Sequence, residues 1–232
     1  MSLQQKRLDE LFAFDSLTGK SGPHEFRRIT VITSCTNRKA ITHPDALGVN
    51  DFLRGERWVA AREASLPLCP AETIYTGQQH QRLMAGVAAA RQTGICVAVK
   101  VVSAGYGLIS GDRRIVPYNV TFSGLSRQAI RASGKALALP EDFASALFSP
   151  SDIVLVLLGR DYLAACDLTS SVLDDIAVPT VFLTGSQEVI PDHSNPRVRI
   201  ARTYSSDTRT FKAGMVSLKG AIAQQFLAGP CS

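Results

Sequence analysis

The chain has 232 residues, 45% of them hydrophobic, and 25 Lys and Arg outnumber 20 Asp and Glu to give a formal net charge of +5. This composition fits a soluble globular protein with a sizeable core, and the absence of an apolar stretch of roughly 20 residues excludes a membrane helix. The first residues lack the apolar segment of a secretory signal, so we expect a cytoplasmic protein.

The N-terminal part predicts one helix over residues 3–14, where leucine and phenylalanine recur at helical spacing. Residues 15–25 are rich in glycine, serine and proline and predict a loop. Residues 28–34 are apolar and β-branched, which predicts a buried strand. We take residues 1–27 as an N-terminal helix and loop, and 28–232 as the core of a single domain.

In the middle of the chain, segments with the apolar spacing of a helix alternate with short apolar runs typical of strands. Residues 36–72 are polar and irregular, with a helix expected near 50–63. Further elements are predicted in chain order: a strand at 73–75, a helix at 77–94, a strand at 95–102 and a short extended piece at 115–118. Pro117 places this last piece at an edge or outside the sheet.

The C-terminal half continues the alternation. Expected elements are a helix at 124–138, a second helix that starts at Pro140, a strand at 152–158, a helix after Gly159, a strand at 178–183, an edge strand at 198–202 and a helix at 214–227. Strands that alternate with helices predict an α/β fold with a mostly parallel central sheet flanked by helices.

Polar residues follow the first strand, where α/β proteins place ligands. Cys35 is a candidate nucleophile beside cations that stabilise a thiolate, or a small residue packed under the strand end. Lys39 is a candidate amine nucleophile or, more simply, an anion-binding charge. Asn37 can form hydrogen bonds to a base edge, or it is there only because asparagine tolerates the unusual backbone angles of a turn. Its neighbours Ser34 and Thr36 complete the loop.

A second polar loop follows the strand at 95–102, and we expect it to share one pocket with the first. Ser103 offers a hydroxyl, Gly105 permits close approach of a ligand, and Tyr106 can stack on a base. The alternative is a glycine turn with a packed tyrosine. Gln187, in a third strand-end loop, can read an amide or base edge.

No grouping of His, Asp or Glu has the spacing of a metal site. The cysteines are odd in number and widely spaced, which indicates neither a zinc site nor a disulfide framework: Cys35, Cys69, Cys96, Cys166 and Cys231. Cys96 and Cys166 are expected to be core thiols. We predict no metal and no cofactor.

Four motifs in order resemble a family of bacterial and phage proteins related to the peroxide-stress protein YaaA. They cover residues 29–118 and are Cys35 to Lys39 (Cys-x-x-x-Lys), Tyr75-Thr76-Gly77, Ser103 to Leu108 (Ser-Ala-x-Tyr-Gly-Leu), and Pro117-Tyr118. The Cys-x-x-x-Lys turn is also similar to one in archaeosine synthase, which modifies a deazaguanine base in tRNA. Ser34 and Ala40 stand where that enzyme has prolines.

This resemblance implies a three-layer sandwich like that of uracil-DNA glycosylase, with a pocket for a nucleobase or nucleotide to which Tyr75, Gly77 and Tyr118 contribute. The expected function is an enzyme, a nucleobase-modifying transferase or hydrolase, in nucleic-acid modification, stress response or phage defence. A non-catalytic module that senses a nucleotide or binds DNA is the alternative. Expected partners are a nucleobase, nucleotide or nucleic acid, and proteins of a modification or defence system.

Overall fold

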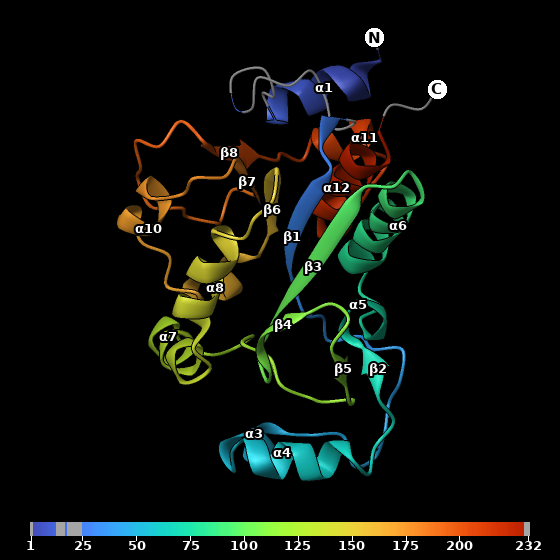
Figure 1. The fold of residues 1–232 in the computed structure, drawn as a ribbon, viewed down its shortest axis with the longest axis vertical. Coiled ribbons are helices and arrows are strands. Elements are labelled where there is room, and N and C mark those ends of the chain that lie inside the picture. The colour runs from blue at the N-terminus through green and yellow to red at the C-terminus, as the bar shows by residue number, and fades with distance from the viewer. Residues whose placement is uncertain (1, 13–16, 18–24, 230–232) are drawn as a thin grey trace.

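A six-stranded sheet forms the centre of the molecule (Figure 1). The computed structural model describes residues 2–12, 17 and 25–229. Along the sheet the strands are β4 (Gly107–Ser110), β3 (Cys96–Ser103), β1 (Arg28–Ser34), β6 (Ile153–Leu157), β7 (Thr180–Thr184) and β8 (Val198–Arg202). Only β4 runs antiparallel to its neighbour. The expected α/β fold class, with a mostly parallel sheet flanked by helices, is therefore confirmed.

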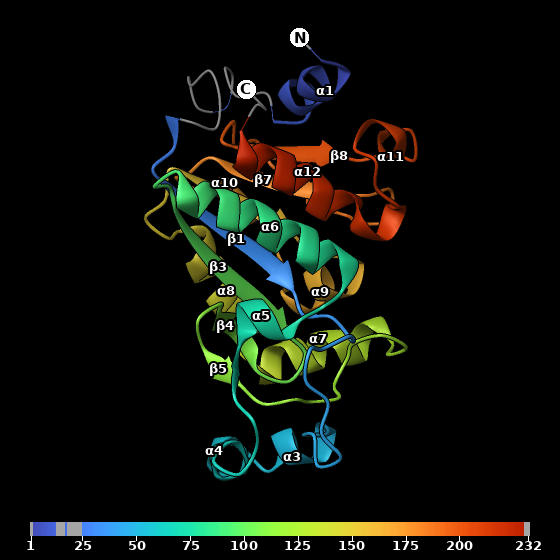
Figure 2. The same cartoon turned by 90° about the vertical axis from the view of Figure 1, so that its right-hand side faces the viewer.

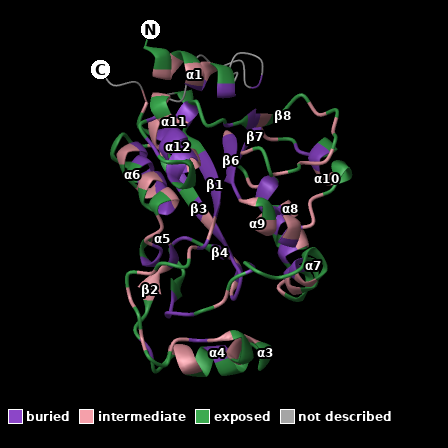
Figure 3. Ribbon diagram, turned by 180° about the vertical axis from the view of Figure 1, so that it is seen from behind, coloured by how far each residue is buried: buried purple, intermediate pink, exposed green. Residues whose placement is uncertain are grey.

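Helices cover both faces of this sheet, and Figure 2 shows the layers from the side. On one face lie α6 (Gln78–Gln92) and α12 (Leu218–Ala228), which pack against each other. The other face carries α7 (Arg127–Ala136), α8 (Leu139–Leu147), α9 (Arg160–Ala165) and α10 (Ser170–Asp174). All five residues of β6 and of β7 are buried, because central strands between two helical layers have no solvent side (Figure 3).

The order of the parallel strands creates a switch point in the sheet. From β1 the chain crosses by way of α6 to β3 on one side, and later returns to place β6 on the other side of β1. Helices that follow β1 and β6 thus lie on opposite faces, which leaves a crevice outside the carboxyl ends of these strands. In doubly wound α/β sheets this crevice is where ligands bind.

Two predicted elements were wrong. Residues 73–75 are not a strand: α5 (Ala71–Ile74) is a helical turn, followed by an isolated bridge between Tyr75 and Lys39. The single helix expected near 50–63 is broken into α3 (Val49–Leu53) and α4 (Glu56–Glu63), since Gly55 adopts a φ of 89° between them.

The second polar loop is also more regular than predicted. Gly107, with a φ of 74°, reverses the chain so that β4 pairs with β3 as a hairpin. A separate two-stranded sheet joins β2 (Cys69–Pro70) to β5 (Arg114–Ile115), so Pro117 lies outside the central sheet as expected. Cys96 is exposed at the start of β3 and is not the core thiol we expected, whereas Cys166 is buried.

Helices α1 (Leu3–Phe12) and α11 (Asp207–Thr210) lie at one end of the molecule, and the 3₁₀ turn η2 (Met215–Ser217) leads into α12 (Figure 2). An ion pair of 2.8 Å between Arg7 Nε and Asp207 Oδ1 holds α1 against α11. Residues 13–14 of the predicted helix, nearly all of the predicted loop at 15–25, and Cys231 lie outside the described residues. Figure 1 places α3 and α4 at the opposite end from α1.

Candidate functional site

The first two polar loops lie side by side at the carboxyl ends of β1 and β3. The Cys35 amide donates a 2.9 Å hydrogen bond to the Val102 carbonyl, which continues the pairing of the two strands into the loops. On its other side the first loop pairs with the segment before α6, where the Thr76 amide donates to the Arg38 carbonyl at 3.0 Å. Parallel pairing therefore brings these loops together.

Cys35 is buried at the base of this region, with 5% of its surface exposed. Its Sγ lies 3.0 Å from the Tyr162 hydroxyl, which α9 supplies from the far side of the switch point. Burial, and then the neighbouring Cys35 sulfur, raise the pKa of Tyr162. The phenol thus keeps its proton at neutral pH, and either group can donate the hydrogen bond that joins it to the sulfur.

Ser103, Tyr118 and Tyr75 form a buried chain of hydroxyl groups beside Cys35. The Tyr118 hydroxyl lies 2.8 Å from Ser103 Oγ and 2.9 Å from the Tyr75 hydroxyl. Ser103 Oγ accepts from the amides of Gly105 and Tyr106, at 3.2 and 3.0 Å. Both of its lone pairs are then occupied, so its own hydrogen goes to the Tyr118 oxygen.

This direction leaves Tyr118 a proton of its own to donate. Burial, then the nearby Cys35 sulfur and Tyr75 hydroxyl, raise the Tyr118 pKa, so this phenol keeps its proton. Burial also raises the Tyr75 pKa, and the hydrogen bond from Tyr118 to the Tyr75 oxygen opposes that effect. The hydrogen of Tyr118 is therefore available to the Tyr75 oxygen, 2.9 Å away, and the Cys35 sulfur has the Tyr162 hydroxyl as its neighbour at 3.0 Å.

Lys39 stands over the same aromatic rings. Its Nζ lies 4.2 Å from the centre of the Tyr118 ring and 6.0 Å from that of Tyr75, and it donates to the Thr36 carbonyl at 3.3 Å. Burial lowers the Lys39 pKa, and the nearby Cys35 sulfur opposes that effect. The ammonium is therefore a half-buried cation that the tyrosine faces and the sulfur stabilise.

Two residues predicted to bind substrate hold the loop itself together. The Thr36 hydroxyl accepts from the Gly77 amide at 3.2 Å and donates to the Arg38 carbonyl at 2.8 Å. A Cβ on Gly77 would lie 2.6 Å from the Thr36 methyl carbon, so only glycine fits there. Asn37, by contrast, is exposed to solvent.

Gly105 is close to a side chain rather than open to a ligand. A Cβ at this position would lie 2.7 Å from two ring carbons of Phe52 on α3. The Phe52 ring also meets Tyr106 edge-on, with centroids 5.0 Å apart, and Tyr118 at 5.9 Å. The structure therefore corrects the reading of Gly105 as a place for ligand approach, because Phe52 fills that space.

An open cavity of about 380 Å³ lies on the other side of Cys35, in the crevice at the switch point. Ser34 and Tyr162 line it, while Cys35 lies behind them. Gln187, exposed on the loop after β7, lines it too. The volume falls within the roughly 300–1,000 Å³ typical of small-molecule sites.

A partly buried ion pair forms one wall of this cavity. Lys219 Nζ lies 2.6 Å from Glu188 Oε1 and donates to the Leu158 carbonyl at 3.0 Å. Burial alone would raise the Glu188 pKa, but the hydrogen bond and charge of Lys219 and the Gly185 amide outweigh it, so the Glu188 pKa is lowered. The pair fixes the loop after β7 against α12.

Sequence reasoning missed four residues that shape this region. Tyr162, Phe52 and Glu188 touch residues far away in the chain, with Tyr162 127 positions from Cys35, and Arg160 lines the cavity. One signal was available for Tyr162, since it lies in the first turn of the helix that follows β6 and begins after Gly159. Nothing in the local sequence marks Phe52 as the neighbour of Gly105.

Within the described residues, no three His, Cys, Asp or Glu side chains gather where they could hold a metal ion. Among the helices that the structure describes, none has both the length and the apolar character to cross a membrane. Comparison of the chain with protein-family models, with curated proteins and with solved structures found no match.

Proposed function

We propose that this protein is an enzyme that acts on a nucleobase or nucleotide, with Cys35 as its nucleophile. The observation that carries the proposal is the position of the Cys35 sulfur, 3.0 Å from the hydroxyl of Tyr162, a residue that lines the cavity at the switch point. The resemblance of the Cys35–Lys39 turn to that of base-modifying enzymes supports the choice of substrate. Nucleic-acid modification, stress response or phage defence is the corresponding cellular role.

The proposed chemistry is addition of the sulfur to an electron-poor carbon of the base. The Cys35 thiolate forms a bond to the carbon of a ring C=N group or nitrile, and one electron pair of that multiple bond moves to the nitrogen. Tyr162 gives this nitrogen its proton and takes up the proton that the Cys35 thiol loses, so the phenol is neutral before and after the step. The Lys39 ammonium, whose pKa the Cys35 sulfur raises against the effect of burial, stabilises the negative charge that develops on the sulfur during the attack.

The first test is a thermal-shift panel of nucleobases, nucleosides, nucleotides and short DNA and RNA, followed by intact-mass analysis of each stabilising compound. The proposal expects one small ligand to raise the melting temperature and to form an adduct that Cys35→Ala abolishes. Cys96→Ala is the matched control, because it removes an exposed thiol at the opposite end of the sheet.

Other outcomes have defined meanings. A non-catalytic nucleotide sensor would bind without an adduct, keep its affinity in Cys35→Ala and lose it in Lys39→Ala. A DNA-binding module would be stabilised by polymers alone, with an affinity that falls steeply as salt rises. No stabilisation by any compound would count against the nucleobase proposal and favour a role as the partner of another protein.

A further inference from the structure

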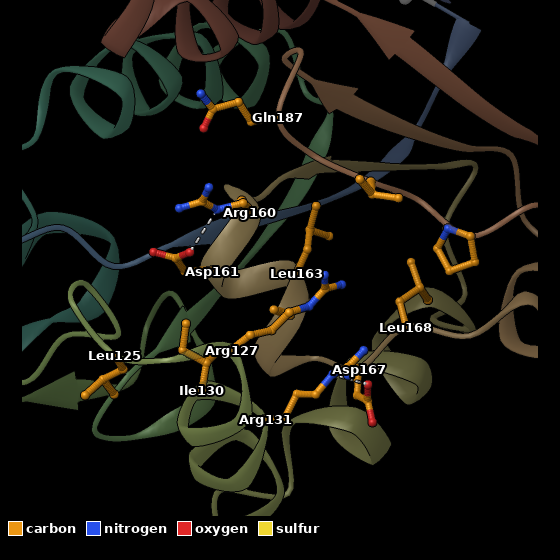
Figure 4. A pocket seen from close by; sticks show the side chains of 13 residues that line it. Leu125, Arg127, Ile130, Arg131, Arg160, Asp161, Leu163, Asp167, Leu168 and Gln187 are labelled. Atoms are coloured by element: carbon orange, nitrogen blue, oxygen red, sulfur yellow. Dashed lines mark hydrogen bonds and ion pairs between the residues drawn. The ribbon is translucent and has the colours of Figure 1, made fainter.

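A second cavity, of about 440 Å³, opens beside the first between α7, α9 and the loop after β7 (Figure 4). It shares Arg160, Asp161 and Gln187 with the cavity next to Tyr162, so the two are neighbours along one crevice. The chemistry proposed for Cys35 does not use its lining.

About half of the residues that line this second cavity are aliphatic. Its apolar residues come from all three surrounding segments and include Leu125, Ile130, Leu163, Leu168, Val189 and Pro191. Leu125 and Val189 are largely exposed, with 46% and 75% of their surface open to solvent. Exposed aliphatic side chains that line a concave surface favour binding of an apolar group.

The lining of this cavity carries more positive than negative charge, with three arginines and two aspartates. Arg131 Nε pairs with Asp167 Oδ1 at 3.1 Å, and Arg160 Nε pairs with Asp161 Oδ1 at 3.3 Å. Arg127 is the third arginine, and no described residue forms a hydrogen bond or an ion pair with its guanidinium. In Figure 4 its side chain extends from α7 toward α9.

We propose that this cavity is a second ligand site, which takes a small molecule with an apolar body and one phosphate or carboxylate group. Arg127 anchors the anion, because a guanidinium matches the planar fork of a carboxylate or two oxygens of a phosphate. The aliphatic wall holds the body of the ligand. The two paired arginines keep their aspartates, so the site favours one anionic group over several.

The experiment measures binding to the full chain by calorimetric titration, with 1-naphthyl phosphate and 1-naphthoate as probes. Inorganic phosphate, which carries only the anion, and 1-naphthol, which carries only the apolar body, are the two halves for comparison. At least one probe should bind about tenfold or more tightly than either half. Arg127→Ala should weaken that probe about five- to tenfold, and Arg127→Lys less, because lysine keeps the charge without the fork. Arg57→Ala, on exposed α4, is the matched control.

A second pair of variants tests the aliphatic wall. Val189→Asp should weaken the probe at least as strongly as Arg127→Ala, whereas Val49→Asp, an exposed valine on α3, should leave it unchanged. Cys35→Ala should also leave it unchanged, so this test is independent of the reaction proposed above. Equal affinity of a probe and of inorganic phosphate or 1-naphthol, or no effect of Arg127→Ala, would overturn the proposal.

Discussion

Replacing Gly105 by alanine tests directly whether Phe52, and not a ligand, occupies the space above this loop. The added Cβ would stand 2.7 Å from two carbons of the Phe52 ring and 3.2 Å from a third. Because carbon atoms pack at about 3.5–4.0 Å, the ring must move by about 1 Å. Gly105 is not among the described glycines with a positive φ, so alanine fits its backbone and the cost comes from the ring.

The expected loss in the free energy of unfolding is about 1–3 kcal/mol, the usual effect of overpacking a well-packed site. Phe52→Ala alone should cost about 1.5–3 kcal/mol, because its ring is only half-buried. In the Phe52→Ala background, Gly105→Ala should cost less than about 0.5 kcal/mol, since the Cβ then meets empty space. The two changes are therefore coupled by about 1–2 kcal/mol.

Equilibrium unfolding in urea measures all four proteins of this cycle, provided that the slope against urea stays the same. Gly214→Ala is the control, because a Cβ there meets no atom within 4 Å. If the costs of the single changes add to that of the double change within about 0.5 kcal/mol, Phe52 does not fill this space and the reasoning is wrong.

Three further predictions concern the ion pair, the loop and the hydroxyl chain. Glu188→Gln should lower the unfolding free energy by about 1–2 kcal/mol at pH 7, a modest value because its pair with Lys219 lines an open cavity. Because the Glu188 pKa is lowered from its ordinary value of 4.5, the pair stabilises the fold above pH 4.5, and this stabilisation is lost as the pH falls below that value. Urea unfolding at several pH values measures this loss, and a difference between the two proteins that does not change with pH would contradict it. Gly77→Ala should lower the free energy of unfolding by about 1–3 kcal/mol, because the new Cβ clashes with Thr36. Adding Thr36→Ser, which removes the methyl group, should restore part of that loss. If nothing is restored, the clash with the methyl group is not the cause. Tyr118→Phe should cost about 1–3 kcal/mol in urea unfolding, because it leaves buried hydroxyls without a partner; an unchanged stability would show that they find others.

The sequence predicted the central strands well because they are short, β-branched and apolar, a pattern that local periodicity detects. It failed at 73–75, where Thr-Ile-Tyr suggests a strand although Ala71 and Ile74, three residues apart, are both buried on one helical turn. It missed β4 because only the positive φ of Gly107 turns that segment back onto β3.

The candidate site was predictable in part for the same reason. The loop residues after β1 and β3 stand out by their place at strand ends, and the structure brings Cys35, Ser103, Tyr75 and Tyr118 together. Tyr162 could not be assigned to Cys35, because their contact depends on β6 lying beside β1, a pairing that no local pattern reveals. The same holds for Phe52, whose position over Gly105 depends on how α3 folds back.

The surroundings of Cys35 differ on its two sides, and this difference limits how a substrate can approach. Toward Lys39 and Tyr118 the region is closed, since Phe52 packs on Gly105 and edge-on against Tyr118. Toward Tyr162 it adjoins the open cavity at the switch point. A ligand in that cavity therefore meets Tyr162 first, and the sulfur becomes accessible when the phenol shifts from its 3.0 Å contact. In this arrangement Lys39 stabilises negative charge on the sulfur from the closed side, whereas the residues that line the cavity bind the ligand.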